Sequence, residues 1–398
     1  MRIFRRFPRE FWVLLGGDSV SHLGYGIFAP YVALYLTGPI GASNTATGLV
    51  LAAWGLVGLL TAPFGGLLSD RIGRRPLILG GLAGSAFCAF AFFLASSVWV
   101  LLALVPLWGL CFSMMRPAMR AYLVDVVDPE LLVEAFGIDR LVANATFALG
   151  PPLGALVITV ASLRDTFLVT GVAELSFLAI AVLWLPESHP AATRAEEPPP
   201  RLTEALHDRL LLLLALGTAL AWFLFALYDE VFGVFLHQDR GLAISTWGLL
   251  FTINPVLVVL TQYPAARWAS GRSPRFVLSL GALLNGLAVF LLLPFTGIAI
   301  VVVSIVLLTA GEILLAPVSS ALAATLAPER LRGSYQSVLD CGYSAASMPA
   351  VSLGLFLVGR GDFEWLLAAA PLVALAATAC FSALPGKGTD VQPVVEAV

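Results

Sequence analysis

The stretch GLLSDRIGRRP, residues 66–76, places one acidic and three basic side chains at the junction of two long apolar runs. Gly73 can supply a tight turn between two helices, and Gly66 can let the preceding helix approach a neighbour closely. Asp70 and the arginines can form charge-assisted hydrogen bonds across a joint between two halves of a molecule. We therefore interpret this stretch, called the 66–76 loop below, as a fastened turn between two membrane helices.

Long apolar runs recur along the whole chain of 398 residues, of which 59% are hydrophobic and 12% charged. A water-soluble domain usually carries about 25% charged residues, so most of this surface must face lipid. A β-barrel is excluded, because its strands alternate polar and apolar residues over about ten positions. A membrane helix needs about 20 apolar residues. The sequence predicts an all-α membrane protein with 12 transmembrane helices, over residues 11–36, 46–69, 77–95, 98–122, 132–160, 164–185, 208–236, 243–268, 275–294, 297–325, 332–358 and 363–384.

Arginines are concentrated in the N-terminal tail and in every second loop. Positively charged loops stay in the cytoplasm, so we expect a multi-pass protein of the plasma membrane (a bacterial inner membrane) with both termini cytoplasmic. The polar stretch 187–207 contains three consecutive prolines and predicts a flexible cytoplasmic linker. It would separate an N-terminal six-helix bundle over 1–186 from a C-terminal six-helix bundle over 208–398.

The two predicted bundles share positions when they are overlaid, as Pro117 then aligns with Pro317. Such matches indicate two pseudo-symmetric halves. The counterpart of the 66–76 loop is the 267–275 loop, in which Gly271 stands at the position of Asp70. We therefore expect the charged contacts of the 66–76 loop to have no equivalent at the 267–275 loop.

The 66–76 loop closely resembles the G-x-x-x-D-R-x-G-R-R signature of the major facilitator superfamily, which also lies between the second and third helices. With the twelve spans, the resemblance covers essentially the whole chain and implies the major facilitator fold. It also implies that Asp70 faces the N-terminus of the eleventh helix and that Arg74 pairs with Asp125. The alternative is a simple positive-inside anchor. The implied conformational latch, which would hold an outward-open state, comprises Gly66, Asp70, Arg71, Gly73, Arg74, Arg75 and Asp125.

The fifth predicted helix contains GPPLG, residues 150–154, which resembles part of a motif of the family's antiporters. Gly150, Pro151 and Gly154 match its core, so the resemblance favours the drug:proton antiporter branch. The alternative is ordinary close packing with a local bend. The fourth-helix arginine of many drug antiporters corresponds to Val105 here, so its role cannot be transferred to this chain.

Charges inside predicted helices mark candidate functional groups, because a charge at the bilayer centre costs from about 2.5 to more than 10 kcal/mol. The resemblance implies that helices 1, 4, 7 and 10 line a central cavity, where a carboxylate could exchange a proton. For each carboxylate the alternative is a structural hydrogen bond to a neighbouring helix. For Glu174, in the sixth helix, a partner helix and an oligomer contact both stay open. The proton-coupling candidates are Glu312, Glu230, Asp229 and Asp18.

Other polar and aromatic side chains are candidates for contact with a substrate. Asp18 and Arg116 could pair, and Arg140 and Asn144 could add polar groups to the same region, unless Arg140 snorkels to the interface. Aromatic side chains would suit amphipathic or lipophilic substrates through stacking and cation–π attraction, although they also pack helices and anchor interfaces. The substrate-cavity candidates are Arg116, Asn144, Tyr25, Tyr31, Trp222, Tyr228 and Tyr343.

The sequence contains no phosphate-binding loop, no HExxH pair, no nucleophile elbow and no cysteine or histidine spacing typical of a metal site. We therefore expect neither an enzyme nor a cofactor or metal. The leading hypothesis is a secondary active transporter that exports a small, lipophilic or drug-like molecule by proton-coupled alternating access. One alternative is a proton-coupled or facilitative importer of a sugar or organic acid, and another is a non-transporting membrane sensor. The expected partners are a small-molecule substrate, protons and the lipid bilayer. We expect no nucleic-acid partner, and we expect the protein to function as a monomer.

Overall fold

The computed structural model describes residues 6–37, 39–42, 56–57, 60–61, 64–188, 201–242, 244–294 and 297–385. The regular structure of these residues is helical, with no β-strand among them. A helix closes its backbone hydrogen bonds within one segment, which is what an apolar run needs in lipid. The predicted all-α class is therefore confirmed.

Nine helical segments within the described residues are long and apolar enough to cross a membrane. Each lies within a few residues of a predicted span. They are α4 (Arg74–Leu94), α5 (Val98–Val126), α6 (Leu132–Val160), α7 (Asp165–Trp184), the continuous run of α10, η4 and α11 (Arg209–Ala226, Leu227–Val231 and Phe232–Gln238), α14 (Pro274–Leu291), α15 (Ile298–Leu326), α16 (Arg332–Arg360) and α17 (Glu364–Ser382).

Two predicted spans are interrupted. The first divides into α1 (Arg9–Phe28), a 3₁₀ turn η2 (Ala29–Tyr31) and α2 (Val32–Thr37). Pro30 sits in this turn, where its missing N–H costs no hydrogen bond of a longer helix. The eighth divides into α12 (Ile244–Phe251) and α13 (Ile253–Ser270).

The seventh span contains a different irregularity, because η4 is a π-helical turn between α10 and α11. The second predicted span, 46–69, lies largely outside the described residues, which are helical again over 64–72. A short helix, α9 (Leu202–His207), occupies the end of the segment predicted to be a flexible linker.

The chain forms two compact units that do not follow the chain halves. Unit 1 comprises Met1–Asp128, Val142–Leu202 and Glu329–Ser337, and unit 2 comprises Pro129–Leu141, Thr203–Pro328 and Val338–Val398. The first residues of α6 therefore belong to unit 2, and the first residues of α16 belong to unit 1. The bundles over 1–186 and 208–398, with their linker over 187–207, stay a prediction.

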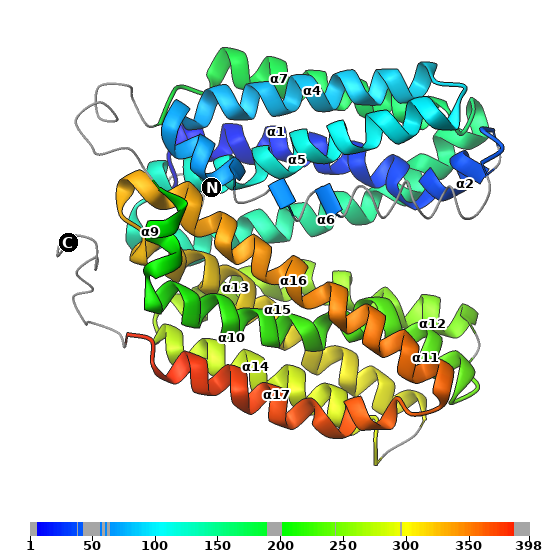
Figure 1. Cartoon of the computed structure of the whole chain (residues 1–398), viewed down its shortest axis with the longest axis vertical. Helices are drawn as coiled ribbons and strands as arrows, with labels where there is room; N and C mark the ends of the chain where they lie inside the picture. Colours follow the sequence, from blue (N-terminus) through cyan, green and yellow to red (C-terminus); the bar gives the residue numbers. More distant parts are fainter. Residues whose placement is uncertain are drawn as a thin grey trace. The chain divides into compact units, whose positions relative to one another are not determined.

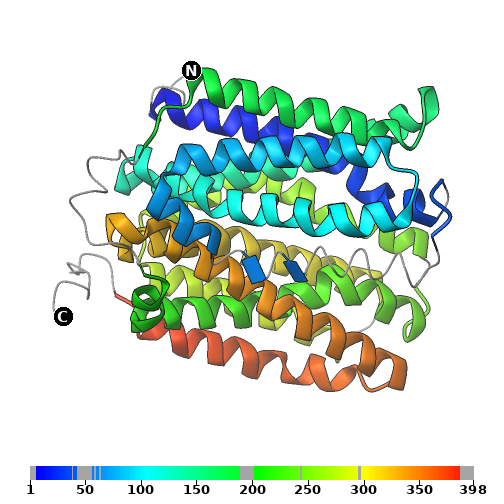
Figure 2. The same ribbon diagram turned by 45° about the horizontal axis from the view of Figure 1, so that its top comes forward.

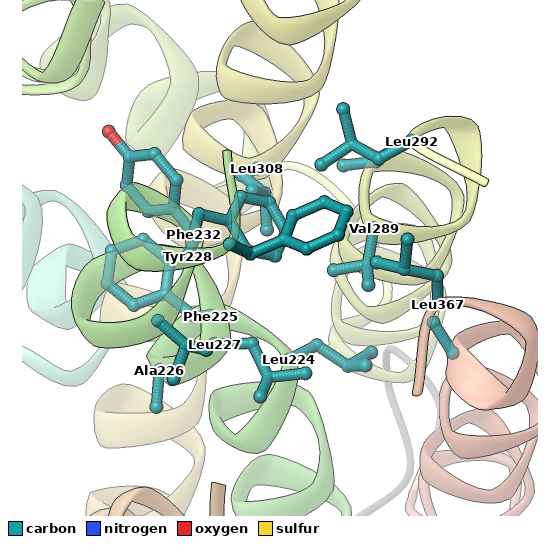
Figure 3. Packing of buried hydrophobic residues seen from close by; sticks show 14 of the residues in the cluster. Leu224, Phe225, Ala226, Leu227, Tyr228, Phe232, Val289, Leu292, Leu308 and Leu367 are labelled. Atoms are coloured by element: carbon teal, nitrogen blue, oxygen red, sulfur yellow. The ribbon is translucent and has the colours of Figure 1, made fainter. Parts of the chain in front are cut away.

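Within unit 1, α7 packs along α1 and α4, and α4 also packs against α5 (Figure 2). Within unit 2, α14 packs against α10, α15 and α17 (Figure 1). A hydrophobic cluster joins the helices of unit 2 around the π-helical turn, and Figure 3 shows Phe232 of the seventh span beside Val289 of α14, with Phe225 and Tyr228 on the other side of the cluster. The turn that carries two acidic residues is therefore held by a packed core.

Candidate functional site

The 66–76 loop turns at Gly73, whose φ of 106° lies in the left-handed region where a side chain would be strained. The Asp70 carboxylate meets the first residues of α16. Its Oδ1 accepts a hydrogen bond from Gly333 N at 3.0 Å, and its Oδ2 accepts from Ser334 N at 2.9 Å and Ser334 Oγ at 2.7 Å. A helix N-terminus offers free N–H groups and a partial positive charge. The carboxylate thus caps α16 from a segment more than 260 residues earlier in the sequence.

Two arginines continue this contact within unit 1. Arg74 is fully buried, donating from Nη1 to Asp70 Oδ1 at 2.7 Å and from Nε to Asp125 Oδ2 at 3.1 Å. Arg332 Nη1 donates to the other oxygen of Asp125 at 2.9 Å. Each acid therefore faces a cation, as a buried charge requires. We call Asp70, Arg74, Asp125 and Arg332, with the N–H groups of α16, the Asp70 network.

Two glycines allow the Asp70 network to close. A Cβ atom on Gly333 would lie 2.6 Å from the carbonyl oxygen of Gly66, so the two backbones touch. Arg71, by contrast, is exposed. The structure thus brings Gly66, Asp70, Arg74 and Asp125 together, with Arg71 exposed beside them, while the role of these residues as a latch stays a prediction.

Residues directly after α7 belong to the same region but were missed by the sequence analysis. Glu187 accepts hydrogen bonds from the backbone N–H groups of Arg74 (3.0 Å) and Arg75 (3.3 Å), which begin α4. Ser188 Oγ donates to Asp125 Oδ2 at 2.8 Å, and Arg75 Nε donates to Leu185 O at 2.7 Å. An acidic residue followed by a serine at the end of an apolar run was the available signal, because such residues cap helices.

The GPPLG motif lies in α6 and packs on α1 in unit 1. A Cβ atom on Gly26 would lie 3.0 Å from Gly150 Cα, and Gly154 faces Ile27 and the Tyr31 ring. Tyr31 Oη donates to Pro151 O at 2.7 Å, in a helix that contains two consecutive prolines. These contacts are those of a close helix crossing.

A group of polar residues surrounds a buried carboxylate in unit 2. Glu312, on α15, is 2% exposed; it pairs with Arg140 of α6, and its Oε2 accepts from Asn254 Nδ2 of α13 at 2.7 Å. Asn254 Nδ2 also donates to Thr309 Oγ1 at 3.0 Å. The Arg140 side chain is 29% exposed, so the ion pair has one accessible side. We call these four residues the Glu312 site.

This position of Arg140 differs from both sequence interpretations. Arg140 neither joins Asp18 and Arg116 nor stands alone at an interface, because residues 129–141 pack with unit 2. A charged side chain inside a membrane segment pairs with an opposite charge where the fold brings one close. Here the fold brings Glu312 close to Arg140. Asn144, one turn later on the same helix, is half buried.

The acids of the seventh span lie near the Glu312 site. Asp229 and Glu230 both occupy the π-helical turn and are both exposed. The charges of Glu312 and Arg140 act on Asp229. A π-helical turn rotates successive side chains differently from an α-helix and is frequent at functional sites, which accounts for the shared exposure.

The aromatic candidates of unit 2 are buried to different degrees. The Trp222 ring lies 5.4 Å from Arg140 Cζ and 5.3 Å from the half-exposed ring of Tyr343. Tyr228 is 1% exposed and belongs, like Trp222, to the hydrophobic cluster. In Figure 3 its hydroxyl points away from the other side chains that are drawn. A cavity of about 430 Å³ in unit 2, lined by residues such as Phe235, Arg240 and Leu292, includes none of the predicted site residues.

A second group of charges is buried in unit 1. Arg116 Nη1 of α5 donates to Asp18 Oδ1 of α1 at 3.2 Å, so the structure contains the hypothesised pair. His22 Nδ1 lies 3.3 Å from Asp18 Oδ2, and Ser21 Oγ donates to Glu174 Oε1 of α7 at 2.7 Å. We call these five residues the Asp18 cluster. Sequence reasoning missed Ser21 and His22, although both lie within one turn of Asp18 on the same helix.

Tyr25 is the remaining aromatic candidate and lies one turn beyond the Asp18 cluster on α1. Its ring is stacked between those of Phe112 and Phe147, at centroid distances of 6.0 Å each. Arg116 Cζ lies 5.8 Å from the same Phe112 ring. The aromatic group therefore joins three helices of unit 1 next to a cation.

Comparison with protein families identifies one match over nearly the whole chain. The model of the Major Facilitator Superfamily matches residues 14–241 and 214–394. Its two overlapping matches agree with a duplicated architecture.

Curated relatives are transport proteins of bacteria. The chain is 27% identical over 330 residues to the uncharacterized MFS-type transporter YqjV of Bacillus subtilis, covering 81% of this chain and 80% of the relative. It is 24% identical over 376 residues to a Na(+), Li(+), K(+)/H(+) antiporter of Planococcus maritimus, covering 86% and 88%. It is also 24% identical over 248 residues to the quinolone resistance protein NorA of Staphylococcus aureus, covering 61% and 64%.

Solved structures share the same fold. The human organic anion transporter MFSD10 (TETRAN) superposes with a TM-score of 0.76 at 18% identity, covering 94% of this chain and all of that one. At this identity the likeness speaks for the fold alone. Taken with the family match, the chain is a multi-pass membrane transport protein without enzymatic activity.

Proposed function

This chain belongs to the major facilitator superfamily, and on that premise we propose that it exports a small, lipophilic or drug-like molecule in exchange for protons. One observation carries the proposal: Glu312, 2% exposed in a membrane helix, is held by Arg140 and Asn254. An ionisable pair inside the membrane is a functional-site hypothesis by default, because apolar side chains would pack there at lower cost.

The chemistry of the Glu312 site suits proton coupling. When a proton binds Glu312, the attraction to Arg140 is lost, and Arg140 becomes available to another partner, such as Asp229. Protonated and deprotonated states then present different charges to a cargo, and a ligand shifts a conformational equilibrium only by such differential binding. Alternating access would follow from this difference.

Aromatic side chains support the proposed substrate class. Trp222 and Tyr343 contact one another beside Arg140, and Tyr25 is stacked with two phenylalanines in unit 1. Aromatic faces bind apolar and cationic molecules without demanding a unique shape. The quinolone resistance relative and the cation/proton antiporter relative support efflux and proton exchange respectively.

We propose further that the Asp70 network is a conformational latch. Asp70 is 2% exposed and joins two segments far apart in the chain, so its hydrogen bonds either all form or all break. The arginine-rich ends of the helices support a cytoplasmic position for this network and for both termini, in a bacterial inner membrane.

The proposal is tested by transport into everted membrane vesicles loaded with a pH-sensitive dye. A panel of lipophilic cations and quinolones is tested one compound at a time. We expect each transported compound to release protons from the acidified vesicles. Glu312→Gln should abolish this release and make the remaining flux independent of pH. Glu364→Gln is the matched control, because Glu364 is exposed and pairs with Arg240 at 3.2 Å.

The other outcomes identify the alternatives. Protons that move in the same direction as a sugar or organic acid would make the protein an importer. Absence of flux for every compound in reconstituted liposomes, with a folded protein, would favour a non-transporting sensor. Unchanged pH dependence in Glu312→Gln would overturn the role of the Glu312 site.

A further inference from the structure

The Asp18 cluster contains an acid that the proposed mechanism does not use. Glu174 is 4% exposed, and one of its oxygens accepts from Ser21 Oγ at 2.7 Å. Its other oxygen, Oε2, is buried and has no hydrogen-bond partner in the described part of the chain. A buried carboxylate oxygen without a donor is costly in the charged form.

The neighbouring cations already have a partner. Arg116 and His22 both contact Asp18, at 3.2 and 3.3 Å, while Glu174 forms no ion pair within the described residues. Two nearby acids compete for the same positive charge, and the acid that loses this competition binds a proton more readily. Asp18 has the closer cations, so Glu174 is the acid that takes the proton.

Tight packing keeps water from Glu174. On one side, the Phe177 ring fills the space above Gly17, and on the other, Thr170 Oγ1 donates to Gly24 O at 2.8 Å. The other helix packed against α7 is α4, which carries no charged side chain beyond Arg74 and Arg75 in its first turn. Charged groups that act on Glu174 are therefore Asp18, His22 and Arg116 alone among the described residues.

We propose that Glu174 is a second proton-binding site, located in unit 1 and separate from the Glu312 site. A proton from water binds Oε2, the neutral acid keeps its hydrogen bond from Ser21, and the same proton returns to water on release. Solvent reaches the cluster at Arg116 and His22, whose side chains are 21% and 18% exposed. A role of this proton in transport rests on the proposed proton-coupled function, whereas proton binding to Glu174 can be measured without transport.

The test is infrared spectroscopy of the purified protein in liposomes, titrated with pH. A protonated carboxyl group gives its own carbonyl band, and we expect such a band in the wild type at neutral pH. The band should be absent from Glu174→Gln and retained in Glu312→Gln and in the exposed control Glu364→Gln. Loss of transport in Glu312→Gln therefore does not affect this measurement.

A second variant covers the case in which Glu174→Gln fails to fold. Ser21→Ala keeps the acid and removes one hydrogen bond, so the same band should persist and move to higher frequency. The proposal is overturned if the wild type shows no protonated carboxyl band, if the band survives in Glu174→Gln, or if Ser21→Ala leaves its frequency unchanged.

Discussion

The 66–76 loop and the 267–275 loop hold corresponding positions in the sequence, but their charges are used differently. In the first, Asp70 and Arg74 are buried and bound to one another at 2.7 Å. In the second, Arg275, the counterpart of Arg74, is exposed. Arg272, the counterpart of the exposed Arg71, is stacked 3.9 Å above the Trp268 ring and donates to Trp268 O at 2.7 Å. The comparison teaches that the duplicated turn forms a buried ion-pair network only in the loop that carries an acidic residue to pair with its arginines.

The largest effect is expected for Asp70→Ala. The substitution leaves the fully buried Arg74 without its nearer partner and removes the cap of α16. Breaking a buried pair by removing one partner costs about 3–5 kcal/mol, measured as a lower unfolding temperature in detergent. Arg272→Ala is the control, and a similar loss in both variants would contradict the difference between the loops.

Gly333→Ala should follow in size. The added methyl group would lie 2.6 Å from Gly66 O and 3.0 Å from Asp70 Oδ1, and overpacking of this kind costs about 1–3 kcal/mol. Gly271→Ala is the matched control in the second loop, where the nearest atom to the new Cβ is Trp268 O at 3.8 Å. Thermal unfolding of the two variants side by side should show a loss in the first alone; equal stability would mean that the backbones separate freely.

A smaller effect is expected for Arg332→Ala. Arg332 is 22% exposed and binds Asp125 at 2.9 Å, but Asp125 keeps Arg74 and Ser188 as donors. We expect a coupling energy of about 1 kcal/mol in a double-mutant cycle with Asp125→Ala, since a partly exposed pair is screened by water. The exposed pair of Arg360 and Asp362 supplies the control cycle. A coupling below that of the control would remove Arg332 from the Asp70 network.

The smallest effect should come from copying the acid into the second loop. Gly271→Asp restores the missing carboxylate but places it beside the exposed Arg272, where surface ion pairs contribute less than about 1 kcal/mol. Unfolding temperatures should therefore change little at low salt and not at all at high salt. A salt-resistant increase would show that one acid is sufficient to fasten this turn.

The helices could be predicted closely because bilayer thickness limits their length. The fifth span was predicted over 132–160 and is α6 (Leu132–Val160), and the ninth begins one residue from its predicted start. The breaks at Pro30 and Thr252 and the π-helical turn were not predicted. The average hydropathy of a segment is insensitive to such local changes of the backbone.

Partners of the buried charges were predictable only in part. The resemblance to the family directed attention to Arg74 and Asp125, and the sequence analysis allowed that Asp18 and Arg116 could pair. Arg140 was placed with the wrong acid, because Glu312 is 172 residues away in the chain. Depth in a membrane can be read from position in a span, whereas the direction in which a side chain points requires the rotation of each helix about its axis.

By itself the sequence determined the membrane environment, the approximate ends of the spans and the charged loop between the second and third helices, since each depends on local composition and spacing. Tertiary structure alone decided that the start of α16 belongs to unit 1, that Glu312 forms an ion pair with Arg140, and that Glu174 accepts a hydrogen bond from Ser21. The physical reason is that hydropathy is summed along one segment, while an ion pair or a hydrogen bond exists only where two segments meet at about 3 Å.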